Sequence, residues 1–135
     1  MAHRILIIDD EESIRDAFML ALASMPDCDV LPAADGAEGI RLIEEQRPDL
    51  VFLDLHMPGL TGMDVVRHVL PEDPSLPIYV VTAFHQEFMQ ELRAARDAGL
   101  HFELACKPLG AEQIRSITRA ILGGGEIQVT EGSKR

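Results

Sequence analysis

Several residue classes are scarce in this sequence of 135 residues, and each scarcity excludes a class of protein. Tryptophan is absent and aromatic residues make up only 4%, so the core must consist mainly of aliphatic side chains. No apolar run approaches the roughly 20 residues that a membrane-spanning helix needs. The formal net charge of −11 disfavours nonspecific binding to nucleic acid or to an anionic membrane. Because hydrophobic residues still reach 47%, we expect one soluble globular domain.

Cysteine is scarce as well. Cys28 and Cys106 each lie in an apolar stretch, and the first residues lack the charged leader and apolar segment of a secretory signal. This pattern is typical of buried, reduced thiols in a cytoplasmic protein. A catalytic cysteine would need a nearby histidine, and Cys106 has only distant ones, which disfavours that alternative.

Short apolar runs alternate with helical patterns along the chain. The alternation favours an α/β fold with an open parallel sheet and helices on both faces. Residues 5–8 are apolar throughout, as expected for a strand that is buried on both faces. Strands are expected at 5–8, 28–33, 50–53, 76–81 and 102–106, and helices at 12–25, 37–46, 63–69, 86–98 and 111–122.

The last helix is followed by three glycines, and residues 123–135 carry no pattern that would build a core. No internal repeat or low-complexity tract precedes them. We therefore assign residues 1–122 to a single domain and expect 123–135 to be a flexible C-terminal tail or the start of a linker.

Acidic residues follow two of the predicted strands. Asp9 and Asp10 come directly after 5–8, and Asp54 comes directly after 50–53. In open α/β sheets the ligand crevice lies beyond the carboxyl ends of the strands, so neighbouring strands would bring these three carboxylates together. Their mutual repulsion favours a bound cation, and all-oxygen ligation favours Mg²⁺. The alternative is that strand ends merely collect polar residues where they meet solvent.

Two further residues suit phosphoryl transfer. Thr82 ends the fourth strand region and Lys107 ends the fifth. When a carboxylate attacks phosphorus, charge on the phosphoryl oxygens must be neutralised by a metal on one side and by a cation or hydroxyl group on the other. Each residue alone has an ordinary explanation, because threonine is common in strands and a lysine at a strand end is usually solvated. Together with Asp54 they indicate a phosphoryl-transfer site.

Four stretches of the chain resemble the receiver domains of bacterial response regulators, including chemotaxis regulators. They are Ile7-Ile8-Asp9-Asp10-Glu11, Asp54-Leu55-His56-Met57-Pro58-Gly59-Leu60-Thr61-Gly62, Val81-Thr82-Ala83 and Lys107-Pro108-Leu109. The resemblance covers residues 4 to 122 in the order of the family, and its D-x-x-M-P-x-x-x-G stretch is the most specific part. It implies a flavodoxin-like sheet of strand order 2-1-3-4-5.

The resemblance also implies roles for individual residues. Asp54 would be the phosphoacceptor, and Asp9 and Asp10 would hold Mg²⁺ together with Asp54 and the backbone carbonyl of His56. Thr82 and Lys107 would bind the phosphoryl group, and the peptide between Lys107 and Pro108 would be cis. Phosphorylation would switch the surface of the fourth helix, fifth strand and fifth helix.

The resemblance further implies a cytoplasmic phosphorelay protein. Its phosphodonor would be a sensor histidine kinase or a phosphotransfer protein, and its output a downstream protein target, without direct binding to nucleic acid or membrane. The protein would be a monomer or a phosphorylation-dependent dimer. It would be a signalling switch rather than an enzyme, catalysing only its own phosphoryl transfer and dephosphorylation.

The sequence departs from the family pattern near the fourth helix. Receiver domains usually carry Tyr or Phe three residues before the lysine, where this chain has Leu104, and the interval of 25 residues between Thr82 and Lys107 is longer than usual. Phe102 lies two residues before Leu104, so both face the same side of a strand. We expect Phe102 to replace the missing switch aromatic. Phe84 is bulky enough to shield an acyl phosphate, which predicts slow dephosphorylation.

Two alternatives remain at this point. One is an interaction module that keeps the fold but is never phosphorylated, for which Leu104 and the longer fourth-helix region leave room. The other is a metal-dependent phosphohydrolase with an aspartyl intermediate. That class generally needs a second acid two residues after the nucleophile, whereas this chain has His56 there.

Overall fold

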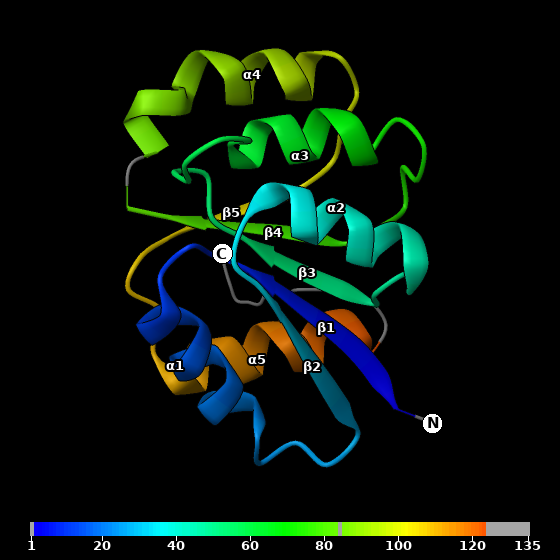
Figure 1. The fold of residues 1–135 in the computed structure, drawn as a ribbon, viewed down its shortest axis with the longest axis vertical. Coiled ribbons are helices and arrows are strands. Elements are labelled where there is room, and N and C mark those ends of the chain that lie inside the picture. The colour runs from blue at the N-terminus through cyan, green and yellow to red at the C-terminus, as the bar shows by residue number, and fades with distance from the viewer. Residues whose placement is uncertain (1, 84, 124–135) are drawn as a thin grey trace.

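A computed structural model describes residues 2–83 and 85–123, with His85 described by its backbone only. The described residues form one sheet of five parallel strands in the order β2-β1-β3-β4-β5. Helices α2, α3 and α4 cover one face, and α1 and α5 cover the other (Figure 1). The predicted fold and strand order are therefore confirmed.

Strands and helices alternate along the chain, with both η1 and α4 between β4 and β5. They are β1 (His3–Ile8), α1 (Glu12–Leu22), β2 (Cys28–Ala33), α2 (Gly36–Glu45), β3 (Leu50–Leu53), α3 (Gly62–Val69), β4 (Ile78–Thr82), the 3-10 helix η1 (His85–Phe88), α4 (Met89–Asp97), β5 (Glu103–Cys106) and α5 (Ala111–Leu122). None of the helices in this described part of the chain is long and apolar enough to cross a membrane.

Several predicted boundaries differ from the observed ones, and a local reason explains three of the differences. Helix α1 ends at Leu22 rather than at residue 25, because its last turn tightens and Pro26 follows shortly after. Strand β4 begins at Ile78 rather than at residue 76, since Pro77 has no N–H to donate to the ladder. The predicted helix 86–98 divides into η1 and α4, and Gly99 ends it with φ of 92°.

The central strands are buried on both faces. Ile5 to Ile8 of β1 and Leu50 to Leu53 of β3 are at most 1% exposed. Alternate residues point to opposite sides and build two clusters, one under α2, α3 and α4 and one under α1 and α5. The second cluster is centred on Phe52, whose ring lies 5.0 Å from that of Phe18. Because both faces are closed, only the strand ends reach solvent.

Polar contacts join the surface helices to one another. The Arg115 guanidinium of α5 donates a hydrogen bond of 3.1 Å to the carbonyl of Ala21 near the end of α1, whose last turn holds no basic residue.

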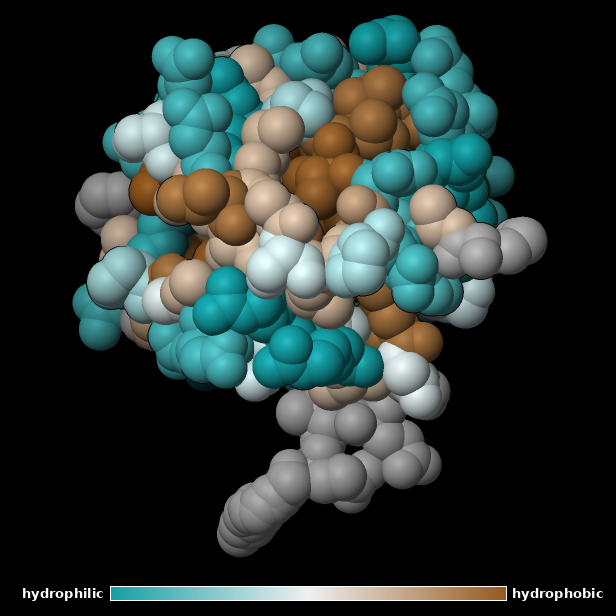
Figure 2. Space-filling view, turned by 90° about the horizontal axis from the view of Figure 1, so that it is seen from below, coloured by the Kyte–Doolittle hydropathy of each residue, from teal (hydrophilic) through white to brown (hydrophobic). Residues whose placement is uncertain are grey.

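Figure 2 shows the molecule from the side of α1 and α5, where hydrophobic residues form patches between hydrophilic ones. The large exposed hydrophobic residues of α1 are Met19 and Leu20, the latter 78% exposed.

The cysteines deviate in part from the prediction of buried thiols. Cys28 is half-buried, and burial raises the pKa of its thiol, with added effects from Asp27 and Asp29. Cys106 is exposed because it ends β5, the outermost strand of the sheet. Both cysteines lie in the described part of the chain, and neither forms a disulfide.

Thr61 caps helix α3 and offers a test of this local structure. Its hydroxyl accepts a hydrogen bond from the Asp64 N–H at 3.2 Å, while its own N–H donates to the Asp64 carboxylate at 2.9 Å. Thr61→Ala removes the first of these bonds and should lower the free energy of unfolding by about 1 kcal/mol in urea titrations. Ser116→Ala on the exposed side of α5 is the control, and equal losses in the two variants would contradict the assigned cap.

Candidate functional site

The predicted acidic residues meet at the carboxyl ends of two neighbouring strands. β1 and β3 pair in parallel with Ile8 opposite Leu53, so Asp9 and Asp54 leave the sheet side by side. One carboxylate oxygen from each of Asp9, Asp10 and Asp54 lies within 4.8 Å of the others. The convergence inferred from the sequence is therefore confirmed in the described structure.

The three carboxylates of this cluster differ in their exposure to solvent. Asp9 is 3% exposed and Asp54 is 5% exposed, whereas Asp10 is open to solvent. Burial raises the pKa of Asp54 to about 6, and the negative charge of Asp9 adds to the effect. The charge of Lys107 and a hydrogen bond from the His56 backbone act in the opposite direction but are outweighed.

Asp9 is held from four directions. Its carboxylate accepts hydrogen bonds from the Glu11 N–H at 3.0 Å and from the Lys107 ammonium at 2.9 Å. Its backbone N–H donates to the Ala33 carbonyl at 3.1 Å, and its own carbonyl accepts from the Arg15 guanidinium at 2.8 Å. Sequence reasoning missed Arg15, because a single arginine six residues downstream carries no signal without the turn that brings it back.

Lys107 reaches the carboxylates from the other side of the site. Its ammonium lies 3.5 Å from the Asp54 carboxylate in addition to its contact with Asp9, and its side chain is 16% exposed. Burial tends to lower the pKa of Lys107, but the hydrogen bond with Asp9 and the charge of Asp54 raise it overall. The peptide between Lys107 and Pro108 is cis, as the resemblance implied.

Thr82 ends β4 beside Lys107. It is fully buried, and its carbonyl accepts a hydrogen bond of 3.1 Å from the Lys107 N–H, which continues the pairing of Thr82 with Cys106 between the two strands. The structure thus brings Asp9, Asp10, Asp54, Thr82 and Lys107 to one edge of the sheet.

Glycines shape the loop that follows Asp54. A Cβ atom at Gly62 would lie 2.4 Å from the Asp54 carbonyl oxygen and 2.8 Å from Leu55 Cα, so no larger residue fits without displacing the backbone. Gly59 has φ of 77°, which disfavours other residues. The close contacts at Gly62 explain why the D-x-x-M-P-x-x-x-G stretch ends in glycine, because α3 begins directly against the backbone of Asp54 and Leu55.

His56 takes part through its backbone and through its side chain. Its backbone N–H is hydrogen bonded to the Asp54 carboxylate. Its imidazole is 56% exposed and lies 3.5 Å from the Glu87 carboxylate of η1. The imidazole therefore links the loop after β3 to the segment before α4, a contact that the sequence did not indicate.

The two expected switch residues, Leu104 and Phe102, lie at different places relative to β5. Leu104 lies opposite Val80 within the sheet and is half-buried. Phe102 precedes the first residue of β5, at the end away from Lys107, and is 7% exposed. Arg96 of α4 donates a hydrogen bond of 3.1 Å to the Phe102 carbonyl and stacks 4.8 Å from its ring. Phe102 belongs to the hydrophobic cluster on the side of α2, α3 and α4, and Leu104 packs against the same cluster.

The donor set suits a hard divalent cation. The clustered ligand atoms are all oxygens, and three carboxylates face one ammonium, which leaves an excess of negative charge. Two of the three carboxylates are buried, where unneutralised charge is costly, while exposed Asp10 leaves access for a hydrated ion. These residues fit Mg²⁺.

Comparison of the sequence with known protein families assigns the chain to one of them. Residues 5–119 match the response regulator receiver domain family. The chain belongs to this family. Among relatives of this receiver domain, the transcriptional regulatory protein AfsQ1 of Streptomyces coelicolor is 33% identical over 129 residues, which are 96% of this chain and 55% of AfsQ1. The response regulator MprA of Mycobacterium sp. (strain KMS) is 38% identical over 122 residues, 90% of this chain and 51% of MprA.

Solved structures agree with this assignment. The chemotaxis protein CheY4 of Vibrio cholerae superposes with a TM-score of 0.75 at 26% identity, over 90% of this chain and 99% of CheY4. NtrX of Brucella abortus gives the same TM-score and identity over 91% of this chain but only 28% of NtrX. The chain spans about half the length of the curated relatives it matches.

Two expectations lie outside the described residues. Phe84, which was expected to shield the phosphorylated site, is not described, and neither are residues 124–135 of the expected tail.

As a receiver domain, the protein is a component of two-component phosphorelay signalling.

The raised pKa of Asp54 gives a testable pH dependence. A carboxyl group whose pKa is higher in the folded state contributes stability that is fully present below about pH 4 and is lost as the pH rises through about 6. In buffer with a chelator, we expect Asp54→Asn to raise the free energy of unfolding near pH 7 by about 1 to 3 kcal/mol, with the gain vanishing at about pH 4. Urea titrations at both pH values measure it.

The matched control for that measurement is Asp16→Asn, which removes one carboxylate from the exposed side of α1. It should leave the pH dependence of stability unchanged. A gain for Asp54→Asn that is independent of pH, or the same pH dependence in both variants, would contradict the assigned electrostatics.

Proposed function

We propose that Asp54 accepts a phosphoryl group from a phosphohistidine of a sensor histidine kinase or a phosphotransfer protein, in a Mg²⁺-dependent reaction. The observation that carries the proposal is the buried Asp54 carboxylate, which lies between two other carboxylates and the Lys107 ammonium at the open ends of β1, β3 and β5. Membership of the receiver domain family supports the same reading.

The chemistry follows from the positions of the side chains. An Asp54 carboxylate oxygen attacks phosphorus, the P–N bond to the donor imidazole breaks, and its electron pair stays on the imidazole nitrogen. The product at Asp54 is an acyl phosphate. When bound at Asp9, Asp10, Asp54 and the His56 carbonyl, Mg²⁺ supplies positive charge that offsets the carboxylates and the phosphoryl oxygens.

Lys107 and Thr82 provide the remaining charge neutralisation. Lys107 lies 3.5 Å from the Asp54 carboxylate and can pair with a phosphoryl oxygen by a small movement of its ammonium. Thr82, at the adjacent strand end, can donate a hydrogen bond from its hydroxyl group to a second phosphoryl oxygen. The phosphoryl group adds roughly −1.5 to −2 charges, so both residues are drawn toward it.

The response would spread from these residues to helix α4, strand β5 and helix α5. Leu104 borders a cavity of about 330 Å³ beneath α4, lined also by Met89, Leu92 and Arg96, so α4 has room to shift against β5. Arg96 joins α4 to Phe102. We infer that Leu104 and Phe102 together replace the single aromatic switch residue of the family. Phe102 would move together with α4, because Arg96 of α4 contacts both its carbonyl and its ring.

The partners follow from charge. A net charge of −11 favours protein partners over nucleic acid for the residues in this chain. AfsQ1 carries the name of a transcriptional regulatory protein, but the matching region covers 55% of it. We therefore propose recognition of a downstream protein by the switched surface in the cytoplasm, as a monomer or a phosphorylation-dependent dimer.

Small phosphodonors test phosphate acceptance directly. Incubation with acetyl phosphate or phosphoramidate and Mg²⁺ should add one phosphoryl group to the intact mass, and a chelator or Asp54→Asn should abolish the gain. Asp16→Asn serves as the control and should be labelled like the wild type. Failure of the wild type to become labelled at saturating donor would instead indicate an interaction module that is not phosphorylated.

Phe102 provides a test of the switch. In Phe102→Leu, the shifts of the α4 backbone amides on phosphorylation should shrink several-fold while the extent of Asp54 phosphorylation stays the same, because Arg96 of α4 loses its contact with the Phe102 ring. Adding Leu104→Phe, which restores an aromatic residue at the usual position, should recover the response. Amide shifts in Phe102→Leu equal to those of the wild type would remove Phe102 from the switch.

A further inference from the structure

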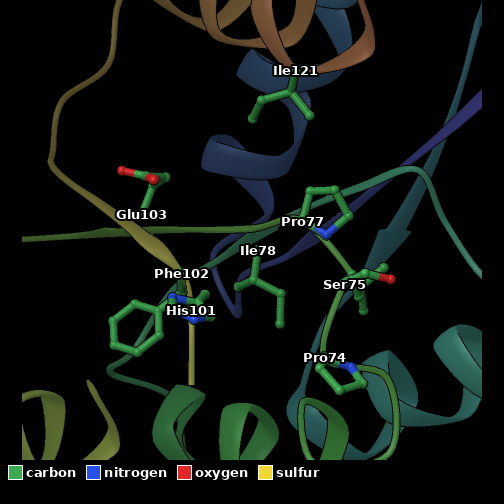
Figure 3. Close-up of a pocket in the computed structure, with 9 residues that line it drawn as sticks. Pro74, Ser75, Pro77, Ile78, His101, Phe102, Glu103 and Ile121 are labelled. Atoms are coloured by element: carbon green, nitrogen blue, oxygen red, sulfur yellow. The ribbon is translucent and has the colours of Figure 1, made fainter. Parts of the chain in front are cut away.

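A second cavity, of about 330 Å³, lies at the opposite end of the sheet from the site described above. Leu76, Ile78 and Phe102 line it and are at most 7% exposed. Ile121 of α5 faces the cavity from the side of the helix, across from Pro77 (Figure 3). His101 and Glu103 lie at its edge and are exposed, so the cavity has an apolar lining and a polar rim.

This cavity is separate from the phosphorylation site. It lies beside Ile78 and Glu103, the first residues of β4 and β5, whereas Thr82 and Lys107 lie at or beyond the last ones. A strand rises about 3.3 Å per residue, so the length of β4 alone separates the two sites by more than 10 Å. No residue assigned to phosphoryl transfer lines it.

The chain itself continues from the mouth of the cavity. Ile121 lines the cavity, and only Leu122 separates it from Gly123, the last described residue. A chain spans at most about 3.3 to 3.6 Å per residue, so the next few residues can reach the cavity from Gly123.

The sequence that follows contains one apolar pair. Within 124–135 the only hydrophobic residues are Ile127 and Val129, and polar residues surround them. In an extended segment, residues two apart point to the same side. Both are β-branched, so they lose little rotamer freedom on burial. The segment thus offers two adjacent apolar side chains within reach of an apolar cavity.

We propose that this cavity is an intramolecular docking site for residues 124–135, with the side chains of Ile127 and Val129 covering Ile78, Phe102 and Ile121. A segment tethered at Gly123 has an effective concentration in the millimolar range at a nearby site. A second copy of the chain or a separate peptide lacks that advantage, so the tethered segment is the favoured occupant. The docked segment fixes the direction in which the chain leaves the domain.

Single charged substitutions in the full chain test the proposal. Ile127→Asp and Val129→Asp place a carboxylate on the buried side, while Gln128→Asp and Thr130→Asp add the same charge at neighbouring positions on the other side. All four positions lie outside the residues that the structure describes. We expect the first two to shift the backbone amide resonances of Ser75, His101, Phe102 and Glu103 and to lower the Tm, and the two controls to do neither.

The outcomes separate the possible occupants. Identical pocket resonances in all four variants would overturn the proposal, because the cavity would then not contact Ile127 or Val129. Pocket shifts in the wild type that depend on protein concentration would place a second copy in the cavity and would also overturn it. Phosphorylation at Asp54 is not required for docking, so the result stands independently of the labelling tests.

Discussion

The contact of one ammonium with two buried carboxylates is the interaction on which the rest of the site depends. Lys107 lies 2.9 Å from Asp9 and 3.5 Å from Asp54, and all three groups are largely removed from water. Without that positive charge, two neighbouring carboxylates would be buried together at a cost of several kcal/mol. The compensation is partial, since the pKa of Asp54 is still raised to about 6. The site therefore keeps an excess of negative charge, which a bound cation would offset.

The positions of Asp9 and Asp54 are set by the packing of the strands that carry them. Strands β1 and β3 are buried on both faces, so their register is fixed by the core and sets Asp9 beside Asp54. Gly62 then allows α3 to begin against the backbone of Asp54. The same packing leaves α4 less tightly held, with a cavity beside Leu104 and polar contacts through His56 and Glu87 at its amino end.

Much of this was predictable because it depends on pattern and order. The apolar runs gave the strands, and the acidic and basic residues at their ends, Asp9, Asp54 and Lys107, gave the site. Contacts that depend on tertiary geometry were not predictable. Arg15 on the Asp9 carbonyl, His56 beside Glu87 and Arg96 on the Phe102 ring each join residues whose spacing carries no signal. Cys106 was expected to be buried from local hydrophobicity, but its place on an edge strand decides its exposure.

We expect the phosphoryl group to be attached to Asp54 and to no other side chain. An acyl phosphate is reduced by borohydride to an alcohol, which converts a phosphorylated aspartate to homoserine. After labelling with a small phosphodonor and Mg²⁺, mass spectrometry of the reduced and digested protein should find homoserine at position 54 alone. Homoserine at position 9 or 10, or a stable phosphoryl group on His56, would contradict the account.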